Sequence, residues 1–241
     1  MNFKLEVIGF SIEGCLIAQK AGADRIELCD NPGEGGTTPS HGFIKAAREK
    51  SGIDLFPMIR PRGGDFLYSN EEFEIMKTDV ILCKQLGCDG VVFGMLNADG
   101  TVDKERSAIL VELAYPMSAS FHRAFDRTAD AFKALEDIID IGCERILTSG
   151  QKPNVMNGTD LIAKLIQQAD ERIIIMPGSG LRSDNVIELA KKTGAIEFHT
   201  SARMHAESKM AYINPVMNEN LKPVSADSDE IKKIIANLKS I

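Results

Sequence analysis

Short apolar runs alternate with amphipathic stretches along the whole chain, and the same kind of joint separates them. A helical pattern ends near a glycine, and an apolar, strand-like run follows within a few positions. Glycine ends helices readily because it adopts the left-handed conformation without a Cβ clash. The joint recurs as AGAD at 21–24, SGID at 51–54, LGCD at 86–89, IGCE at 141–144 and TGAI at 193–196.

The apolar runs have the length of buried strands. Strands separated by helices imply parallel βαβ units, and eight of these units in 241 residues predict one α/β domain, a (β/α)8 TIM barrel spanning 1–241. A doubly wound sheet is the alternative, but no GxGxxG follows the first strand. The predicted strands are KLEVIG (4–9), RIELC (25–29), LFPMIR (55–60), GVVFG (90–94), SASFH (118–122), RILTSG (145–150), RIIIMPG (172–178) and EFHTSA (197–202).

Several of the predicted helices carry start signals. Ser69 and Glu72 have the spacing of a capping box at the start of a long helical pattern. Thr128 and Ser183 are candidate N-caps of two later helices. These signals place helix starts directly after predicted strands, as a barrel requires.

The segment 203–226 differs from the rest of the chain. It has no sustained hydrophobic period and contains two prolines. We predict an extended or flexible loop after the eighth strand, followed by a C-terminal helix capped by Asp227 or Ser228. A loop of this length is usually functional or disordered.

Composition and charge exclude several classes of function. The chain is 44% hydrophobic and 26% charged, with a net charge of −7, which argues against a nucleic-acid partner. No apolar run approaches the roughly 20 residues that cross a bilayer, so no membrane partner is expected. Residues 1–25 lack a secretory signal pattern, and the five cysteines form no CxxC pair. These features predict a cytoplasmic protein with reduced thiols.

Polar and ionisable residues follow most of the predicted strands. In a parallel barrel the reactive groups lie at the C-terminal ends of the strands. Glu6 lies inside the first strand, where a buried carboxylate needs a partner, and Arg60 or Arg62 is a candidate. The residues at the strand ends are Glu27 with Cys29, Arg60 with Arg62, His122 with Arg123, Thr148 with Ser149, and His199 with Thr200.

The stretch SASFHRAFD places three ionisable groups where the fifth strand ends. His122 would lie at the mouth of the barrel and could exchange a proton near neutral pH. Arg123 and Asp126 could form a pair that fixes the loop, or they could bind a substrate. The structural alternative makes His122 a hydrogen-bonded residue that fills the barrel and Asp126 a helix cap.

The segments after strands seven and eight usually hold phosphate in barrels of this kind. Here they read PGSGL at 177–181 and HTSAR at 199–203. Backbone amides around Gly178, Ser179 and Gly180 could approach an anion, with help from the following helix start. Alternatively, the two glycines only make a tight turn.

The segment RPRGGDF at 60–66 combines two arginines with a glycine pair. Arg60 and Arg62 suit bidentate binding of a carboxylate or phosphate. The alternative is that both arginines neutralise Glu6 and Glu27.

Cys29 is the cysteine that lies at a functional strand end. Cu(I) prefers thiolate and thioether ligands, so Cys29 is a candidate metal ligand, with Met204, His205 or Met210 as softer partners. The spacing follows no recognised ligand pattern. The other cysteines read as small core residues: Cys15, Cys83, Cys88 and Cys143.

Taken together, these motifs resemble the CutC family, which is named for copper homeostasis. The resemblance runs in order from about residue 4 to residue 203 and rests on GADRIELC, EGGTTPS, PMIRPRGGDF, SFHRAFD, RILTSGQK and PGSGL. It implies a cytosolic (β/α)8 barrel, a homo-oligomer such as a dimer or tetramer, and an association with copper tolerance and Cu⁺ binding. It implies no settled reaction.

The family's shared mouth residues carry over onto this chain position by position. One departure concerns strand one: some members have a cysteine directly after the Glu-Val pair, whereas this chain has Ile8 after Glu6 and Val7. A two-thiolate copper site with Cys29 is therefore not expected. The carried-over residues are Glu6, Glu27, Arg60, Arg62, His122, Arg123, Asp126, Thr148, Ser149 and His199, with Cys29 from the RIELC motif.

Two functional hypotheses follow, with a third in reserve. The first is a role in copper homeostasis with copper as ligand at Cys29. The second is an enzyme acting on a small anionic or phosphorylated metabolite, and the third is a scaffold that acts only by assembly. In the enzyme, the catalytic residues would be Glu27, Arg60, His122 and Asp126, and the substrate-binding residues Glu6, Arg62, Arg123, Thr148, Ser149, Gly178, Ser179, Gly180 and His199.

Overall fold

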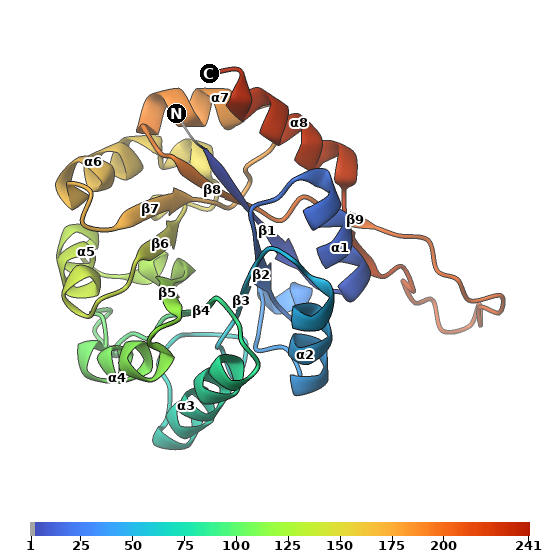
Figure 1. Cartoon of the computed structure of the whole chain (residues 1–241), viewed down its shortest axis with the longest axis horizontal. Coiled ribbons are helices and arrows are strands. Elements are labelled where there is room, and N and C mark those ends of the chain that lie inside the picture. Colours follow the sequence, from blue (N-terminus) through green and yellow to red (C-terminus); the bar gives the residue numbers. More distant parts are fainter. Residues whose placement is uncertain (1–2) are drawn as a thin grey trace.

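The computed structural model describes residues 3–241, in which a ring of parallel strands is surrounded by helices (Figure 1). The predicted (β/α)8 barrel is confirmed. The ring consists of β1 (Lys4–Gly9), β2 (Arg25–Leu28), β3 (Asp54–Pro57), β4 (Gly90–Phe93), β5 (Ser118–Phe121), β6 (Arg145–Thr148), β7 (Ile174–Pro177) and β8 (Glu197–Thr200). The helices are α1 (Ile12–Ala21), α2 (His41–Lys50), α3 (Asn70–Gln85), α4 (Lys104–Ala114), α5 (Ala131–Asp140), α6 (Thr159–Ala169), α7 (Val186–Thr193) and α8 (Ser228–Lys239).

Hydrogen bonds divide the ring into two four-stranded sheets, ordered β3-β2-β1-β8 and β4-β5-β6-β7. Between β3 and β4 the Ile59 amide donates to the Val92 carbonyl at 2.7 Å. Across residues 3–241 no hydrogen-bonded ladder joins β7 to β8. These strands still lie close together, because a Cβ at Gly178 would come within 3.2 Å of the Cβ of His199. Gly178 is therefore required for packing at this junction.

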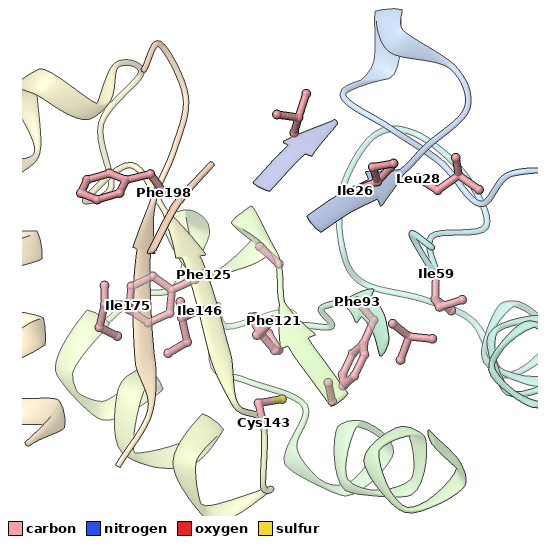
Figure 2. Packing of buried hydrophobic residues seen from close by; sticks show 14 of the residues in the cluster. Ile26, Leu28, Ile59, Phe93, Phe121, Phe125, Cys143, Ile146, Ile175 and Phe198 are labelled. Carbon is pink, nitrogen blue, oxygen red and sulfur yellow. The ribbon is translucent and has the colours of Figure 1, made fainter. Parts of the chain in front are cut away.

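Two apolar clusters fill the space on either side of the ring. The larger lies between strands and helices and includes Phe121, Ile146 and Phe198 (Figure 2). The smaller consists of Cys29, Phe56, Met58 and Val92, with Ile8 and Phe10 packed against it. Successive side chains of a strand point to opposite sides, so one set faces the helices and the other faces the inside of the barrel.

Two of the predicted helix starts are confirmed. Ser69 Oγ accepts from the Glu72 amide at 3.2 Å, and Glu72 Oε2 accepts from the Ser69 amide at 2.8 Å. Asp227 caps α8 by accepting from the amides of Asp229 and Glu230. Both caps use a short polar side chain directly before the first helical turn.

Two other predicted caps are wrong. Asp130 caps α5, while the Thr128 hydroxyl donates to the carbonyl of Phe125 at 2.8 Å. Ser183 donates to Glu230 of α8 at 2.9 Å, and α7 begins only after Asn185. In each case the hydroxyl that the sequence pattern predicted as a helix cap instead donates a hydrogen bond to another acceptor.

The segment 203–226 is partly ordered by its own ends. β9 (Arg203–His205) pairs antiparallel with β10 (Val224–Ala226), which the sequence analysis missed because three-residue strands carry no detectable period. The residues between them extend away from the barrel (Figure 1). They carry exposed apolar side chains, including Tyr212 at 70% and Val216 at 87% exposure.

No helix within residues 3–241 combines the length and the apolar character that crossing a membrane demands.

Candidate active site

A buried ionic layer fills the barrel below the mouth. Arg25 donates from Nε to Glu6 Oε2 at 2.5 Å and from Nη2 to Glu197 Oε2 at 2.7 Å. Arg145 Nε donates to the same Glu197 oxygen at 2.8 Å. Both guanidinium groups lie over the ring of Phe56, at 5.0 and 5.6 Å from its centroid. Two positive and two negative charges therefore balance one another in the interior.

The partners of Glu6 differ from the predicted ones. Strand register places Glu6 beside Arg25 of β2 and His199 of β8, not near Arg60 or Arg62. Its Oε1 lies 2.7 Å from His199 Nδ1. Burial alone would raise the pKa of Glu6, but Arg25 and His199 together lower it to about 2. Glu6 is therefore a fixed anion that orients His199.

Glu27 lies above this layer with one oxygen held and the other free. Its Oε2 accepts from the Cys29 thiol at 3.7 Å and lies 3.9 Å from His199 Nε2. Its Oε1 is buried and has no hydrogen-bond partner in residues 3–241. Burial raises the pKa of Glu27 to about 7, with Glu6 adding to the rise and His199 opposing it. The Glu27 carboxyl can therefore exchange a proton near neutral pH.

His122 follows β5 and is held in one orientation. Its Nδ1 accepts from the Ala124 amide at 3.1 Å, so the remaining ring proton is on Nε2. This Nε2 is buried without a partner in the described chain. Burial and the nearby Arg60 lower the pKa of His122 to about 3. The predicted proton exchange near neutral pH is therefore corrected: His122 is a neutral N–H donor.

Arg60 is buried but meets no carboxylate in residues 3–241. Its Nη1 donates to the carbonyls of Glu34 and Gly36 at 2.7 and 2.9 Å. Its Nη2 donates to the carbonyl of Gly64 at 2.9 Å, and the guanidinium lies 4.9 Å from the centroid of Phe66. Within the described residues, no negative charge neutralises this buried guanidinium, because its partners are carbonyl groups. Such a cation favours binding of an anion nearby.

Arg62 does not reach the mouth. It pairs with Glu72 at 2.5 Å and with Asp65 at 3.0 Å, and its guanidinium lies over Tyr68. The predicted substrate-binding role of Arg62 is therefore corrected, because these contacts use it to attach the 60–66 loop to α3.

Asp126 belongs to a closed hydrogen-bond cluster. Its carboxylate accepts from Thr148 Oγ1 at 2.6 Å and from the amide and hydroxyl of Ser149 at 3.1 and 2.9 Å. The Gln151 amide and Arg123 Nε donate to it as well, at 3.0 and 2.8 Å. With five donors around it, Asp126 fixes the loop and is not free to act as a catalytic acid or base. Thr148 and Ser149 are used in the same cluster.

A cavity of about 490 Å³ opens at the mouth and unites part of the predicted set. Its lining excludes Glu6, Cys29, Arg62, Asp126, Thr148, Ser149 and Gly178, whereas Arg123 from the Asp126 cluster is part of it. Two further arginines, to which the sequence pattern assigned no role, line the cavity: Arg127, which directly follows SFHRAFD, and Arg203, the last residue of HTSAR. The predicted residues that line the cavity are Glu27, Arg60, His122, Arg123, Ser179, Gly180 and His199.

The cavity contains three arginines that form no ion pair in the part of the chain that the structure describes, alongside the carboxyl groups of Glu27 and Glu34. Arg127 donates to the carbonyl of Arg123, and Arg203 donates to that of Pro32, each at 3.3 Å. Neither forms an ion pair with a carboxylate in residues 3–241, and the same holds for Arg60. Three unpaired arginines on a chain with a net charge of −7 indicate a site for an anion.

The 178–180 turn contributes to the cavity wall. Ser179 and Gly180 adopt left-handed backbone conformations, with φ of 78° and 89°. The next helix, α7, begins at Val186, and the side chain of its N-cap, Asn185, donates to the Gly180 carbonyl at 2.9 Å. The contribution of this helix start to anion binding at the turn stays a prediction.

Cys29 packs in one cluster with a thioether, Met58, but its own thiol is in a poor state for binding a soft metal. The thiol is fully buried, and burial together with Glu27 raises its pKa well above the ordinary value. Met204, His205 and Met210 lie on or beside the hairpin and contribute neither to the cavity nor to the Cys29 cluster. The predicted softer partners of Cys29 are therefore not brought to it.

Glu6, Glu27 and His199 form a group that could hold a metal ion, with ligand atoms within 4.8 Å of one another. Oxygen and imidazole donors suit Zn²⁺ or Mn²⁺ better than Cu⁺. Both oxygens of Glu6 already accept from Arg25 and His199, however. Glu27 and His199 Nε2 remain the available atoms.

Comparison with known proteins places this arrangement in a family. The sequence profile of the CutC family matches residues 3–204, which include every predicted site residue. The chain belongs to the CutC family. CutC relatives match over most of their length, including a "family protein CutC" from Chromobacterium violaceum that is 51% identical over 212 residues, covering 88% of this chain and 86% of the relative.

A human relative named "Copper homeostasis protein cutC homolog" is 47% identical over 213 residues, covering 88% of this chain and 78% of the relative. The crystal structure of a CutC protein from Streptococcus agalactiae superposes with a TM-score of 0.78 at 33% identity. It covers 83% of this chain and 98% of that chain. The CutC barrel seen here is thus shared with a solved structure.

Proposed function

We propose that this protein takes part in copper homeostasis. The support is its membership of the CutC family and its 47% identity to the human protein named for that role. The residues at the mouth of the barrel support a second proposal, which concerns the chemistry of the site.

The mouth binds a small anionic metabolite and transfers a proton to or from it. The observation that carries this proposal is the shared cavity of Glu27 and His122, each with a buried polar atom that lacks a protein partner. Buried polar atoms are normally hydrogen-bonded, so unpaired ones on residues that line a cavity indicate a ligand. Arg60, Arg127 and Arg203 supply the charge that selects an anion.

Anion binding is testable with two matched substitutions. Arg127→Gln removes an unpaired charge from the cavity, whereas Arg172→Gln removes an exposed charge between α6 and β7, where it pairs with Glu136 of α5. We expect sulfate, phosphate or citrate at low millimolar concentration to raise the melting temperature of the wild type and of Arg172→Gln. Arg127→Gln should weaken binding roughly 10-fold, since charge-assisted hydrogen bonds contribute about 1.5–3 kcal/mol. No response of the wild type to any anion would contradict the proposal.

Direct copper binding is the finer part of the copper proposal, with Cys29 as its candidate ligand. A metal-bound thiolate must first lose its proton, and position 8 supplies no second thiol because Ile8 stands there. We expect Cu(I) affinity, measured against a competing chelator on the reduced protein, to be micromolar or weaker and little changed in Cys29→Ala. Tighter binding that is lost in Cys29→Ala would show that Cys29 handles copper directly.

Location and assembly complete the proposal. A cytoplasmic location is supported by five free cysteines, all buried, with no disulfide among them. Self-association as a dimer or tetramer is supported by the apolar side chains of the 203–226 hairpin, such as Tyr212 and Val216. Light scattering should give a molar mass that is a multiple of the 26.3 kDa chain mass. A strict monomer at micromolar concentration would contradict self-association.

A further inference from the structure

The geometry points to a reaction class. We propose that the mouth enolises a small anionic carbonyl compound, with Glu27 Oε1 taking a proton from the carbon beside the carbonyl group and His122 Nε2 donating a hydrogen bond to the carbonyl oxygen. This inference rests on the proposed function and deepens it by naming the substrate class and the roles of the two residues.

Glu27 has the arrangement of a positioned base. Its Oε2 is held by the Cys29 thiol at 3.7 Å, while Oε1 is buried, unpaired within residues 3–241 and part of a residue that lines the cavity. His199 Nε2 lies 3.9 Å from Oε2, and its other ring nitrogen is 2.7 Å from Glu6. Glu27, His199 and Glu6 thus form a connected series of ionisable groups, and this series can stabilise the proton that Glu27 receives.

His122 has the arrangement of a neutral electrophile. The Ala124 amide occupies Nδ1 at 3.1 Å, which fixes the proton on Nε2. Phe66 packs on the ring with centroids 4.9 Å apart, and Phe66 also lines the cavity. A neutral imidazole donor polarises a carbonyl group without transferring a full proton to it, and a positively charged one is disfavoured here by Arg60.

The step balances without a cofactor or an oxidant. The C–H bond breaks, its electron pair forms the new C=C bond, and the carbonyl π pair moves onto the oxygen. The proton goes to Glu27 Oε1, and the enolate oxygen accepts the hydrogen bond from His122 Nε2. The reverse step returns the proton to the same carbon. The unpaired charges of Arg60, Arg127 and Arg203 stabilise the anion that develops.

Cys29 does not compete as a nucleophile. Its thiol is fully buried, it donates to Glu27, and it is absent from the cavity lining. Covalent chemistry needs an exposed thiolate, whereas enolisation needs only a base and a hydrogen-bond donor on either side of the substrate.

Two dianions of equal charge separate this inference from simple anion binding. Oxalate is planar and resembles an enolate, whereas malonate has a tetrahedral central carbon. Calorimetry in buffer containing EDTA should show oxalate binding the wild type at least roughly 10-fold more tightly than malonate, since sites complementary to a transition state prefer its analogues. In His122→Asn, which keeps an acceptor for the Ala124 amide, the preference should fall towards 1 while malonate binding persists.

The activity itself is measured by proton NMR in D2O, with pyruvate and dihydroxyacetone phosphate as probes. The wild type should speed deuterium incorporation beside the carbonyl group at least roughly 10-fold over Glu27→Gln. Equal binding of oxalate and malonate, or no incorporation into probes that bind, would overturn enolisation and leave anion binding standing. If neither dianion nor either probe binds, the proposed function falls with it.

Discussion

Replacing Arg25 with methionine is expected to lower the free energy of unfolding by about 3–5 kcal/mol, because breaking a buried pair leaves uncompensated charge behind. Arg25 is 2% exposed and connects Glu6 to Glu197. Its loss leaves Glu6 with His199 alone and Glu197 with Arg145. Urea unfolding at pH 7 measures the change.

Two further variants test whether the loss of stability in Arg25→Met comes from the broken buried ion pairs. Arg172→Met removes an ion pair whose two side chains are about 40% exposed, so it should cost no more than about 1 kcal/mol. Adding Glu197→Gln to Arg25→Met should recover part of the loss, since it removes one of the two carboxylates that lose a guanidinium partner. A loss below about 1 kcal/mol for Arg25→Met would contradict the ionic layer as described.

Glu27→Gln is expected to stabilise the fold at alkaline pH while abolishing proton transfer at the mouth. The groups that face Glu27 are Glu6, Arg25, Cys29 and His199. Because burial raises the Glu27 pKa from 4.5 to about 7, the folded state favours the neutral carboxyl. The contribution of Glu27 to the free energy of unfolding is present in full below its pKa in the unfolded state. It is lost as pH rises through its pKa in the folded state. Glutamine is neutral at every pH and avoids this loss.

The advantage of Glu27→Gln should therefore be small at pH 5 and reach on the order of 2–3 kcal/mol at pH 8.5. Loss of Glu27 also removes the charge that helps to raise the His199 pKa, which reduces the gain. Glu188→Gln on α7, an exposed residue paired with Lys192, is the control and should change nothing with pH. A variant that is less stable than wild type at pH 8.5 would show that Glu27 is a structural anion.

The barrel could be predicted from sequence because its evidence is local. Several helix ends carry their own glycine, as at Gly22 and Gly194, and both adopt the positive φ that this use requires. The hairpin of β9 and β10 could not be predicted in this way, because its pairing joins residues about 20 positions apart through strands of three residues.

The site was predicted less completely because side-chain partners depend on strand register. Glu27 and His122 were found from their place at strand ends, but Arg25 and Glu197 were overlooked because they begin their strands. Their spacing carried a signal: each lies two residues before a predicted site residue and so points to the same side of the sheet. The role of His122 also changed with its environment, since burial lowers its pKa to about 3, whereas burial raises the pKa of Glu27 to about 7.

The most direct test of Glu27 as the acid–base group of the mouth is the titration of its carboxyl carbon by ¹³C NMR, assigned by its absence in Glu27→Gln. We expect a midpoint near pH 7, because burial beside Glu6 disfavours the anion. A midpoint at or below the ordinary value of 4.5 would contradict this role, since Glu27 could not then serve as an acid or base at the mouth.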